Sequence, residues 1–233
     1  MTKFWPWLRL AVAVLGFAAI IRQLTLVVQN ALAAETPWGG DMPTVITNFF
    51  SYFTVLSNLL AAITLIVGAV WAWRTRKAEA KTEATLEPAW LATMFVCVST
   101  YMIITGIVYN VLLRSIPLAG LSDPWTNETL HVVVPLFLLI DVLFAPHRRG
   151  LPWRATFAVA AFPVVWVVYT MTRANFITSP GTGNPWWYPY PFLDPHLVPG
   201  GYLGVTAYIV GIAAAILAVG ALVIWVGRRR ARA

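Results

Sequence analysis

Residues 127–141 read NETLHVVVPLFLLID, a continuous apolar run over 132–140 that His131 precedes and Asp141 follows. Runs of this kind decide the fold, because a helix needs about 20 predominantly apolar residues to cross a bilayer. An ionisable group at membrane depth is costly, so His131 is expected to face a polar cavity or a partner group. Spacing alone favours a simpler interpretation, in which His131 is an interfacial residue at the start of a helix.

Five other stretches of the chain are apolar over a comparable or greater length. Apolar residues make up 59% of the sequence and charged residues only 11%, whereas soluble domains contain about 25% charged residues. The connections are too short for a second domain. We therefore expect residues 1–233 to form one all-α integral membrane domain, a bundle of six transmembrane helices at about 8–28, 47–73, 90–113, 129–146, 153–172 and 201–226.

The formal net charge of +7 is distributed unevenly over the two sides that these spans define. With the N-terminus inside, only Arg114 and Arg173 are basic on the outer side, and Arg22 lies within the first span. This positive-inside distribution predicts cytoplasmic termini, and it makes the basic tail a topology anchor near anionic lipid instead of a nucleic-acid-binding patch. The thirteen basic residues on the cytoplasmic side are Lys3, Arg9, Arg74, Arg76, Lys77, Lys81, Arg148, Arg149, Arg154, Arg228, Arg229, Arg230 and Arg232.

Several other classes of segment and site are excluded. The first span is not expected to be a cleaved signal peptide, because Arg22 interrupts it and the small residues 31–33 follow too far after the first apolar block. Cys97 is the single cysteine and lies inside the third span, which leaves no disulfide and no thiolate metal site. A haem needs paired axial ligands at membrane depth, and only His131 among the three histidines meets that condition. We expect no metal and no cofactor.

Polar side chains gather in the outer halves of the second and third predicted spans. Ser51, Thr54 and Asn58 follow one another at offsets of three and four residues, which places them on one face of a helix. Contacts between helices explain Ser51, since small and hydroxyl residues line such interfaces, whereas the role of Thr54 is left open. Asn110, near the outer end of the third span, is suited to packing or to donating a hydrogen bond into a shared cavity.

Thr54 and His131 are both predicted in the outer half of the membrane. At a rise of 1.5 Å per residue, Thr54 lies about 10 Å and His131 about 3 Å from the outer end of its span. Asn127, one helical turn before His131, is placed to fix the imidazole ring, whereas Asp141 lies about 15 Å further along the axis and cannot be its partner. A hydroxyl and a histidine that face one cavity are the minimum parts for nucleophilic acyl transfer, with Asn or Tyr donors for the oxyanion.

The last outer connection is rich in Trp, Tyr and Pro. Its segment 184–196 reads NPWWYPYPFLDPH, which is suited to a stiff cap at the membrane interface, where aromatic rings sit favourably. The sequence leaves open whether this segment is an ordinary aromatic belt or a substrate lid. Asp194, within the segment, can fold over the cavity.

Three segments together resemble a known family. Residues 126–141 resemble the asparagine–x3–histidine and proline–phenylalanine–acidic segment of the androgen-induced and androgen-dependent TFPI-regulating proteins. Residues 190–194, followed by Pro199 and Gly200, resemble that family's outer Tyr-Pro-Phe-Leu-acidic and Pro-Gly segment. Residues 52–54 resemble its aromatic–x–threonine site, and with Ser57 and Asn58 they have the form typical of bacterial six-span relatives.

That family consists of multi-pass threonine hydrolases that cleave fatty acid esters of hydroxy fatty acids. The resemblance implies that Thr54 is the nucleophile and His131 its base, that the substrate is a lipid ester, and that the protein lies in a bacterial plasma membrane. The sequence departs from the animal pattern around Thr54 and before Tyr190, which bears on the substrate. Further residues suited to orienting the histidine, stabilising the oxyanion or binding the substrate are Asp194, Asn127, Asn58, Asn110, Tyr190 and Arg22.

A second hypothesis is a lipid or small-molecule binding or transport protein that uses the same outer-leaflet polar cavity. Arg22 would then hold an anionic group of the ligand, and the aromatic loop would gate entry. Arg22 is also suited to an ion pair or to satisfying backbone carbonyls, since a charge inside a span requires such a partner.

Overall fold

The computed structural model describes residues 3–79, 86–116 and 122–231, without the side chains of residues 76–79. Over these ranges the chain is helical and contains no β-strand. Six helices in the described part are long and apolar enough to cross a membrane, which confirms the predicted all-α fold with six candidate spans. They are Trp5–Leu32, Phe53–Thr75, Ala89–Leu113, Pro124–Phe144, Ala155–Phe176 and Tyr202–Arg230.

Each span is one long helix or several helices joined end to end. The first is α1 (Trp5–Leu32), the second α3 (Phe53–Glu79), and the sixth α8 (Tyr202–Arg230). The third span continues α4 (Ala89–Val108) into a π-helical turn, η1 (Tyr109–Leu113), and the fifth continues α7 (Ala155–Arg173) into a 3₁₀ turn, η3 (Ala174–Phe176). The fourth joins α5 (Pro124–Glu128), the π-helical turn η2 (Thr129–Val133) and α6 (Val134–Phe144). The short helix α2 (Met42–Phe49) precedes α3, and the 3₁₀ turn η4 (Pro191–Leu193) precedes α8.

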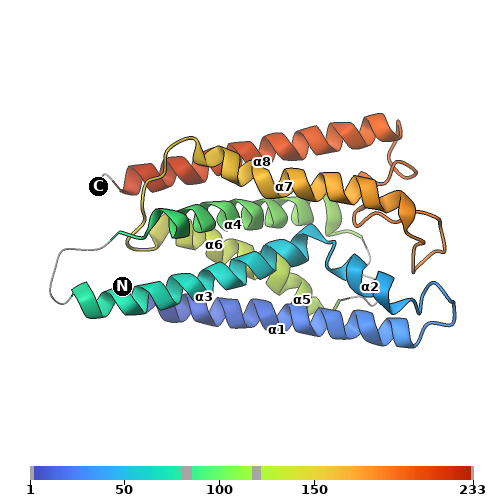
Figure 1. Ribbon diagram of the computed structural model, residues 1–233, viewed down its shortest axis with the longest axis horizontal. Coiled ribbons are helices and arrows are strands. Elements are labelled where there is room, and N and C mark those ends of the chain that lie inside the picture. Colours follow the sequence, from blue (N-terminus) through green and yellow to red (C-terminus); the bar gives the residue numbers. More distant parts are fainter. Residues whose placement is uncertain (1–2, 80–85, 117–121, 232–233) are drawn as a thin grey trace.

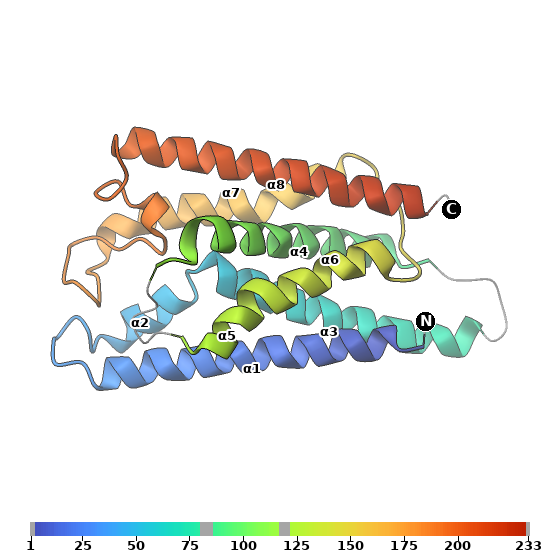
Figure 2. The same cartoon turned by 180° about the vertical axis from the view of Figure 1, so that it is seen from behind.

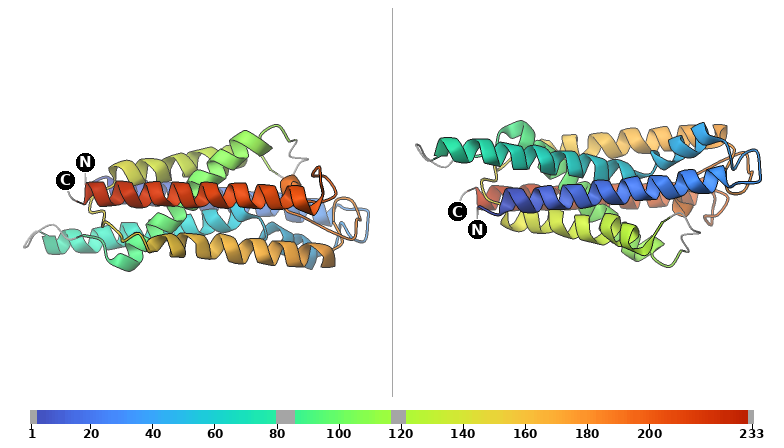
Figure 3. Two further views of the ribbon diagram at one scale, coloured as in Figure 1. Left: turned by 90° about the horizontal axis from the view of Figure 1, so that it is seen from above. Right: turned by 90° about the horizontal axis from the view of Figure 1, so that it is seen from below.

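The helices lie side by side, with α4 near the centre of the bundle (Figures 1 and 2). α4 packs against α3, α6, α7 and α8, and α1 packs along α3. Seen from above, α8 lies between the fourth span and α7 (Figure 3). The first and last described residues lie at one end, here called the terminal end, whereas the connections 33–41 and 177–201 lie at the other, here called the loop end (Figure 1).

The main apolar core surrounds one face of α4. Leu91, Phe95 and Met102 are fully buried there, in one cluster with Leu65 of α3 and Leu138 of α6. Lipid tails are as apolar as these side chains, so in a membrane close van der Waals packing, and not transfer out of water, holds such helices together.

The second span differs from the prediction at the loop end, because residues 50–52 separate α2 from α3. Contacts from distant parts of the chain satisfy the backbone there. The Trp166 indole donates to the Ser51 carbonyl (2.9 Å), and the Thr54 N–H donates to the Tyr190 hydroxyl (3.2 Å). The prediction of one continuous helix carrying Ser51, Thr54 and Asn58 is therefore wrong: Ser51 lies in the turn, and Thr54 lies in the first turn of α3.

The fourth span begins at Pro124 instead of near residue 129, so His131 lies seven residues inside it (131 − 124), about 10 Å along the helix axis. The π-helical turn η2 has a physical reason in Pro135, which has no N–H to donate to the helix. In the π register the Leu130 carbonyl would pair with residue 135. Asn58 of α3 supplies the missing donor, with its amide nitrogen 3.1 Å from the Leu130 carbonyl.

A proline inside α7 is compensated in the same way. Pro163 leaves the carbonyl of Val159, four residues earlier, without its helical donor. The hydroxyl of Tyr101 in α4 donates to this carbonyl over 3.0 Å. Tyr101 therefore connects α4 with α7 at the point where the backbone of α7 is interrupted.

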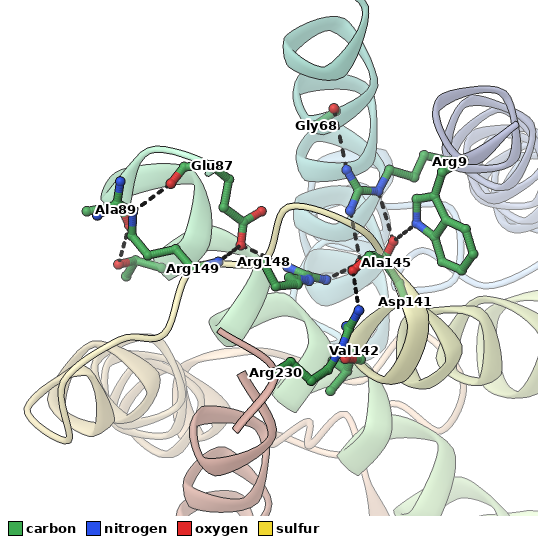
Figure 4. Close-up of polar contacts among 12 residues, drawn as sticks. Arg9, Gly68, Glu87, Ala89, Asp141, Val142, Ala145, Arg148, Arg149 and Arg230 are labelled. Carbon is green, nitrogen blue, oxygen red and sulfur yellow. Dashed lines mark hydrogen bonds and ion pairs between the residues drawn. The ribbon is translucent and has the colours of Figure 1, made fainter. Parts of the chain in front are cut away.

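Buried charges hold the terminal end together (Figure 4). Asp141 of α6 is fully buried and accepts hydrogen bonds from Nε of Arg9 (2.8 Å) and from the Trp5 indole (2.6 Å), both in α1. Arg148, which follows α6, forms a further ion pair with Asp141. The guanidinium groups of Arg9 and Arg148 both lie over the ring of Phe95, at 4.3 and 4.2 Å from its centroid. Arg9 and Arg148, which the charge distribution marked only as signals of membrane topology, are both buried in the packed interior.

Two further residues extend this cluster. The Glu87 carboxylate lies 3.6 Å from Arg148 and accepts the backbone N–H of Arg149. Burial raises the pKa of the Glu87 carboxyl group, and the positive charge of Arg148 opposes that shift. Arg230 of α8 donates to the carbonyls of Val142 (2.9 Å) and Ala145 (2.6 Å) at the end of α6. Two of the thirteen basic residues predicted on the cytoplasmic side, Lys81 and Arg232, lie outside the described residues.

Candidate functional site

A cavity of about 170 Å³ lies among α3, α4, α7 and α8 toward the loop end. The turn η4 contributes Phe192 and Leu193 to its wall, together with the preceding Tyr190. The lining is overwhelmingly apolar, and its polar side chains in the described structure are Thr54, Thr105, Tyr109, Trp166 and Tyr190. The cavity is thus much less polar than the one that the sequence predicted, and its lining suits an alkyl chain.

Thr54 is the hydroxyl residue at the loop-end wall of this cavity. Its side chain is buried, and its Oγ1 lies 3.2 Å from the hydroxyl oxygen of Tyr190. The backbone N–H of Thr54 also donates to that hydroxyl, over 3.2 Å. This N–H is available because the first N–H groups of a helix have no partner within the helix. Burial raises the pKa of the Tyr190 phenol, so Tyr190 is a neutral hydroxyl beside Thr54.

Residues of the next helical turn anchor the backbone of Thr54. Asn58 donates to the Thr54 carbonyl over 2.9 Å and, with the same amide nitrogen, to the Leu130 carbonyl. Ser57 donates to the Thr54 carbonyl over 3.2 Å and lies 3.4 Å from the hydroxyl of Thr105. Asn58 therefore joins the turn that carries Thr54 to the residue that immediately precedes His131.

His131 is oriented by its own helix and by a tyrosine of η1. Its Nδ1 lies 2.9 Å from the carbonyl of Asn127. A carbonyl oxygen only accepts hydrogen bonds, so Nδ1 carries a proton, and in a neutral ring Nε2 is then the acceptor. The ring stacks on Tyr109 at a centroid distance of 4.0 Å. The side chain of Asn127 donates to the Tyr109 hydroxyl over 2.5 Å, so Asn127 contacts both partners of the stack.

The π-helical turn of His131 lies unusually close to α4. A methyl group added to Gly106 would lie 3.1 Å from Cβ of Pro135 and 3.4 Å from the His131 carbonyl. Glycine at this position therefore lets the backbone of α4 approach the fourth span. The approach places Tyr109, three residues after Gly106, against the imidazole ring.

Thr54 lies at the cavity and His131 lies in the neighbouring turn η2, and Tyr109 contacts both places. Tyr109 lines the cavity beside Thr54 and stacks on His131, whereas His131 is not itself among the described residues that line the cavity. The two residues proposed from the sequence thus lie on neighbouring elements, with Asn58 and Tyr109 linking them.

Three other residues from the sequence analysis have their contacts elsewhere. The Asp194 carboxylate accepts the backbone N–H and the Nδ1–H of His196, each over 2.9 Å. Arg22 pairs with Asp123 at 2.7 Å. Asn110 is exposed; it donates to the Gly106 carbonyl and accepts from Arg114.

A cluster that the sequence did not predict lies next to the cavity and centres on Ser51. The Ser51 hydroxyl lies 2.9 Å from the Tyr169 hydroxyl and 3.5 Å from Nη1 of Arg173, while its carbonyl accepts from Trp166. Trp166, Tyr169 and Arg173 follow one another at offsets of three and four residues on α7. That spacing was visible in the sequence, but no signal there connected it with Ser51.

Comparisons of the chain with protein-family models, with curated proteins and with solved structures give no match. The family resemblance in three segments therefore stays a prediction.

Proposed function

We propose that this protein is a membrane-embedded hydrolase that cleaves acyl esters of lipids, with Thr54 as nucleophile and His131 as general base. The observation that carries the proposal is the position of Thr54, whose hydroxyl lies beside Tyr190 at the wall of an apolar cavity. Such a cavity accommodates an acyl chain, and the ester at its end would lie next to the threonine. The resemblance to threonine hydrolases of fatty acid esters of hydroxy fatty acids points to the same substrate class.

In the proposed reaction, Thr54 Oγ1 attacks the carbonyl carbon of the ester and becomes acylated. The C–O bond to the alcohol breaks, and the alcohol leaves with a proton. Water then cleaves the acyl-threonine and restores the hydroxyl. His131 takes the proton from Thr54 at Nε2 and returns it to the leaving alcohol. Because Tyr109 lies between the cavity and His131, the proton passes through the Tyr109 hydroxyl or through a water molecule beside it.

Tyr190 is the proposed oxyanion donor. Its hydroxyl oxygen accepts the Thr54 N–H and lies 3.2 Å from Thr54 Oγ1. In the proposed reaction it donates its own proton to the ester oxygen as negative charge develops there. A buried phenol with a raised pKa keeps that proton, which suits a donor and not a base.

The proposed membrane orientation follows from the distribution of charge. Basic residues concentrate at the terminal end, which by the positive-inside rule faces the cytoplasm. The loop end and its cavity then open toward the outer leaflet of what we propose is a bacterial plasma membrane.

Labelling with a fluorophosphonate probe in membranes tests the assignment. We expect the probe to label the native protein, Thr54→Ala to abolish labelling, and His131→Ala to slow it by about a hundredfold or more, the usual contribution of a general base. Thr64→Ala, on the same helix, and His196→Ala, at the exposed surface, are matched controls that keep labelling. Equal labelling of the native protein and the Thr54 variant would refute the nucleophile.

A lipid-binding or transport protein is the second candidate. The nearly uniform apolar lining and the position of His131 behind Tyr109 favour it. Arg22, which pairs with Asp123, is not the anion anchor in this version of the hypothesis. Lipid retained in the purified protein, together with no probe labelling and no ester hydrolysis, would select this alternative.

A further inference from the structure

Arg173 differs from the other arginines in the half of the molecule near the loop end. Arg22 pairs with Asp123 at 2.7 Å, and Arg114 pairs with Glu128 at 2.8 Å. Arg173 has no carboxylate partner among the described residues 3–79, 86–116 and 122–231. Its guanidinium contacts are the Ser51 hydroxyl at 3.5 Å and the ring of Trp187, whose centroid lies 5.8 Å away.

The contacts of Arg173 connect it with the cavity. Ser51 also accepts the indole N–H of Trp166, which lines the cavity. Trp166 and Arg173 lie on one face of α7, seven residues apart, which is about 10 Å along the axis. Ser51 and Thr54 are three residues apart, so at most about 10 Å of chain separates them. Arg173 therefore lies at the loop-end side of the cavity, beyond the proposed nucleophile.

A role in helix stability alone does not account for this arrangement. A cation in the last turn of a helix interacts favourably with the helix dipole, and Arg173 occupies that position in α7. That interaction needs only the charge near the terminal carbonyls. The guanidinium is instead directed at Ser51 and Trp187, and among the described residues Ser51 accepts a hydrogen bond from one of its five N–H donors.

We propose that Arg173 binds the anionic head group of an amphiphile whose alkyl chain occupies the cavity. The planar fork of a guanidinium matches both a carboxylate and a phosphate, with two parallel hydrogen bonds. In this arrangement the head group lies at the loop end, and the chain passes Thr54 as it enters the apolar space. The inference deepens the proposed function, because it names the residue that holds the charged end of the lipid ester.

Binding to the full-length protein in phosphatidylcholine nanodiscs tests this site without any need for hydrolysis. The probes are palmitate, hexadecyl phosphate and hexadecanol, which share one alkyl chain and differ in the head group. We expect at least one of the two anions to bind about tenfold to a hundredfold more tightly than the alcohol, as hydrogen bonds to a charged group contribute. The two anionic probes distinguish a fatty-acid carboxylate from a lipid phosphate.

Substitutions assign that preference to one residue. Arg173→Gln is expected to bind all three amphiphiles with the native affinity for hexadecanol, which also shows that the variant is folded. Arg173→Lys is expected to keep a reduced preference for the anions, and Arg114→Gln, at another arginine near the loop end, is expected to keep the full preference. Equal binding of the three probes by the native protein, binding of none of them, or a retained preference in Arg173→Gln would overturn the proposal. If the native protein prefers the anionic probes but the phosphonate does not label it, the hydrolase is refuted and the anion site stands.

Discussion

At the scale of single residues, the loop-end site depends on backbone groups as much as on side chains. The helix start at Thr54 leaves an N–H without a helical partner, and Tyr190, 136 residues away in sequence, accepts it. The Asn127 carbonyl similarly fixes the protonated nitrogen of His131. Local backbone geometry thus orients both residues of the proposed pair.

Tyr190→Phe separates the hydroxyl of Tyr190 from the packing of its ring. The ring contacts with Tyr52 and Phe192 remain, but the proposed oxyanion donor is lost. We expect the rate of ester hydrolysis to fall by about a hundredfold, the loss typical of one oxyanion donor, with little change in KM. Steady-state kinetics in detergent measures this, and Tyr188→Phe in the same loop is the control. An unchanged kcat would exclude Tyr190 as a donor to the transition state.

Asp194→Asn decides between two partners for His131. The Asp194 carboxylate contacts His196, whereas His131 is held by the Asn127 carbonyl. We therefore expect this variant to keep probe labelling within about threefold of the native rate, far from the loss that follows removal of a catalytic group. A loss comparable with that of His131→Ala would restore Asp194 as the residue that orients the histidine.

At the scale of helices, prolines remove backbone hydrogen bonds, and side chains of neighbouring helices replace them. Pro135 and Pro163 lie inside spans, and residue 146 after α6 is also a proline. Each leaves a carbonyl without its helical N–H, which inside a membrane is costly unless another group donates. Each of these carbonyls receives a hydrogen bond from a different helix; the donors are Asn58 for Leu130, Tyr101 for Val159 and Arg230 for Val142.

The pair of Tyr101 and Pro163 gives this idea a direct test. Tyr101→Phe leaves the Val159 carbonyl buried without a donor, which should lower the free energy of unfolding by about 1–3 kcal/mol. In a Pro163→Ala background, residue 163 regains its N–H and bonds the same carbonyl, so the cost of Tyr101→Phe should largely disappear. Unfolding of the four proteins in mixed micelles measures this coupling. Equal costs in both backgrounds would show that the Tyr101 hydroxyl has another role.

These same helices show which parts of the fold can be predicted from the sequence. Length and hydropathy predict six spans, because the bilayer fixes how many apolar residues a helix needs. They do not predict the break at residues 50–52, since the groups that stabilise it, Trp166 and Tyr190, are more than a hundred residues away. The sequence does single out Thr54 and His131, because both are polar residues in predicted spans and both lie in segments that resemble a known family. Nothing in the sequence connects Tyr109 with His131, and its place between the cavity and the histidine follows from the close approach of α4 at Gly106.

At the scale of the whole molecule, the two ends of the bundle differ in what they bury. The terminal end buries charges in a dense cluster around Asp141, whereas the loop end contains the apolar cavity. The third span reaches both, with Phe95 of α4 beneath the arginines and Tyr109 of η1 beside His131. We infer that the charged cluster fixes how α1, α4 and α6 meet, and that the loop end is built on this frame.

Asp141→Asn tests that inference, because it leaves Arg9 and Arg148 buried without their counter-charge. Removing one partner of a buried ion pair typically costs about 3–5 kcal/mol, since the remaining charge stays desolvated. We expect a loss of that size in unfolding experiments in mixed micelles. Glu128→Gln is the control, because its pair with Arg114 is largely exposed, and exposed pairs contribute about 0–1 kcal/mol. If Asp141 acts only on the frame, folded Asp141→Asn protein should label with phosphonate at the native rate. A stable variant with slow labelling would instead show that the charged cluster acts on the distant site.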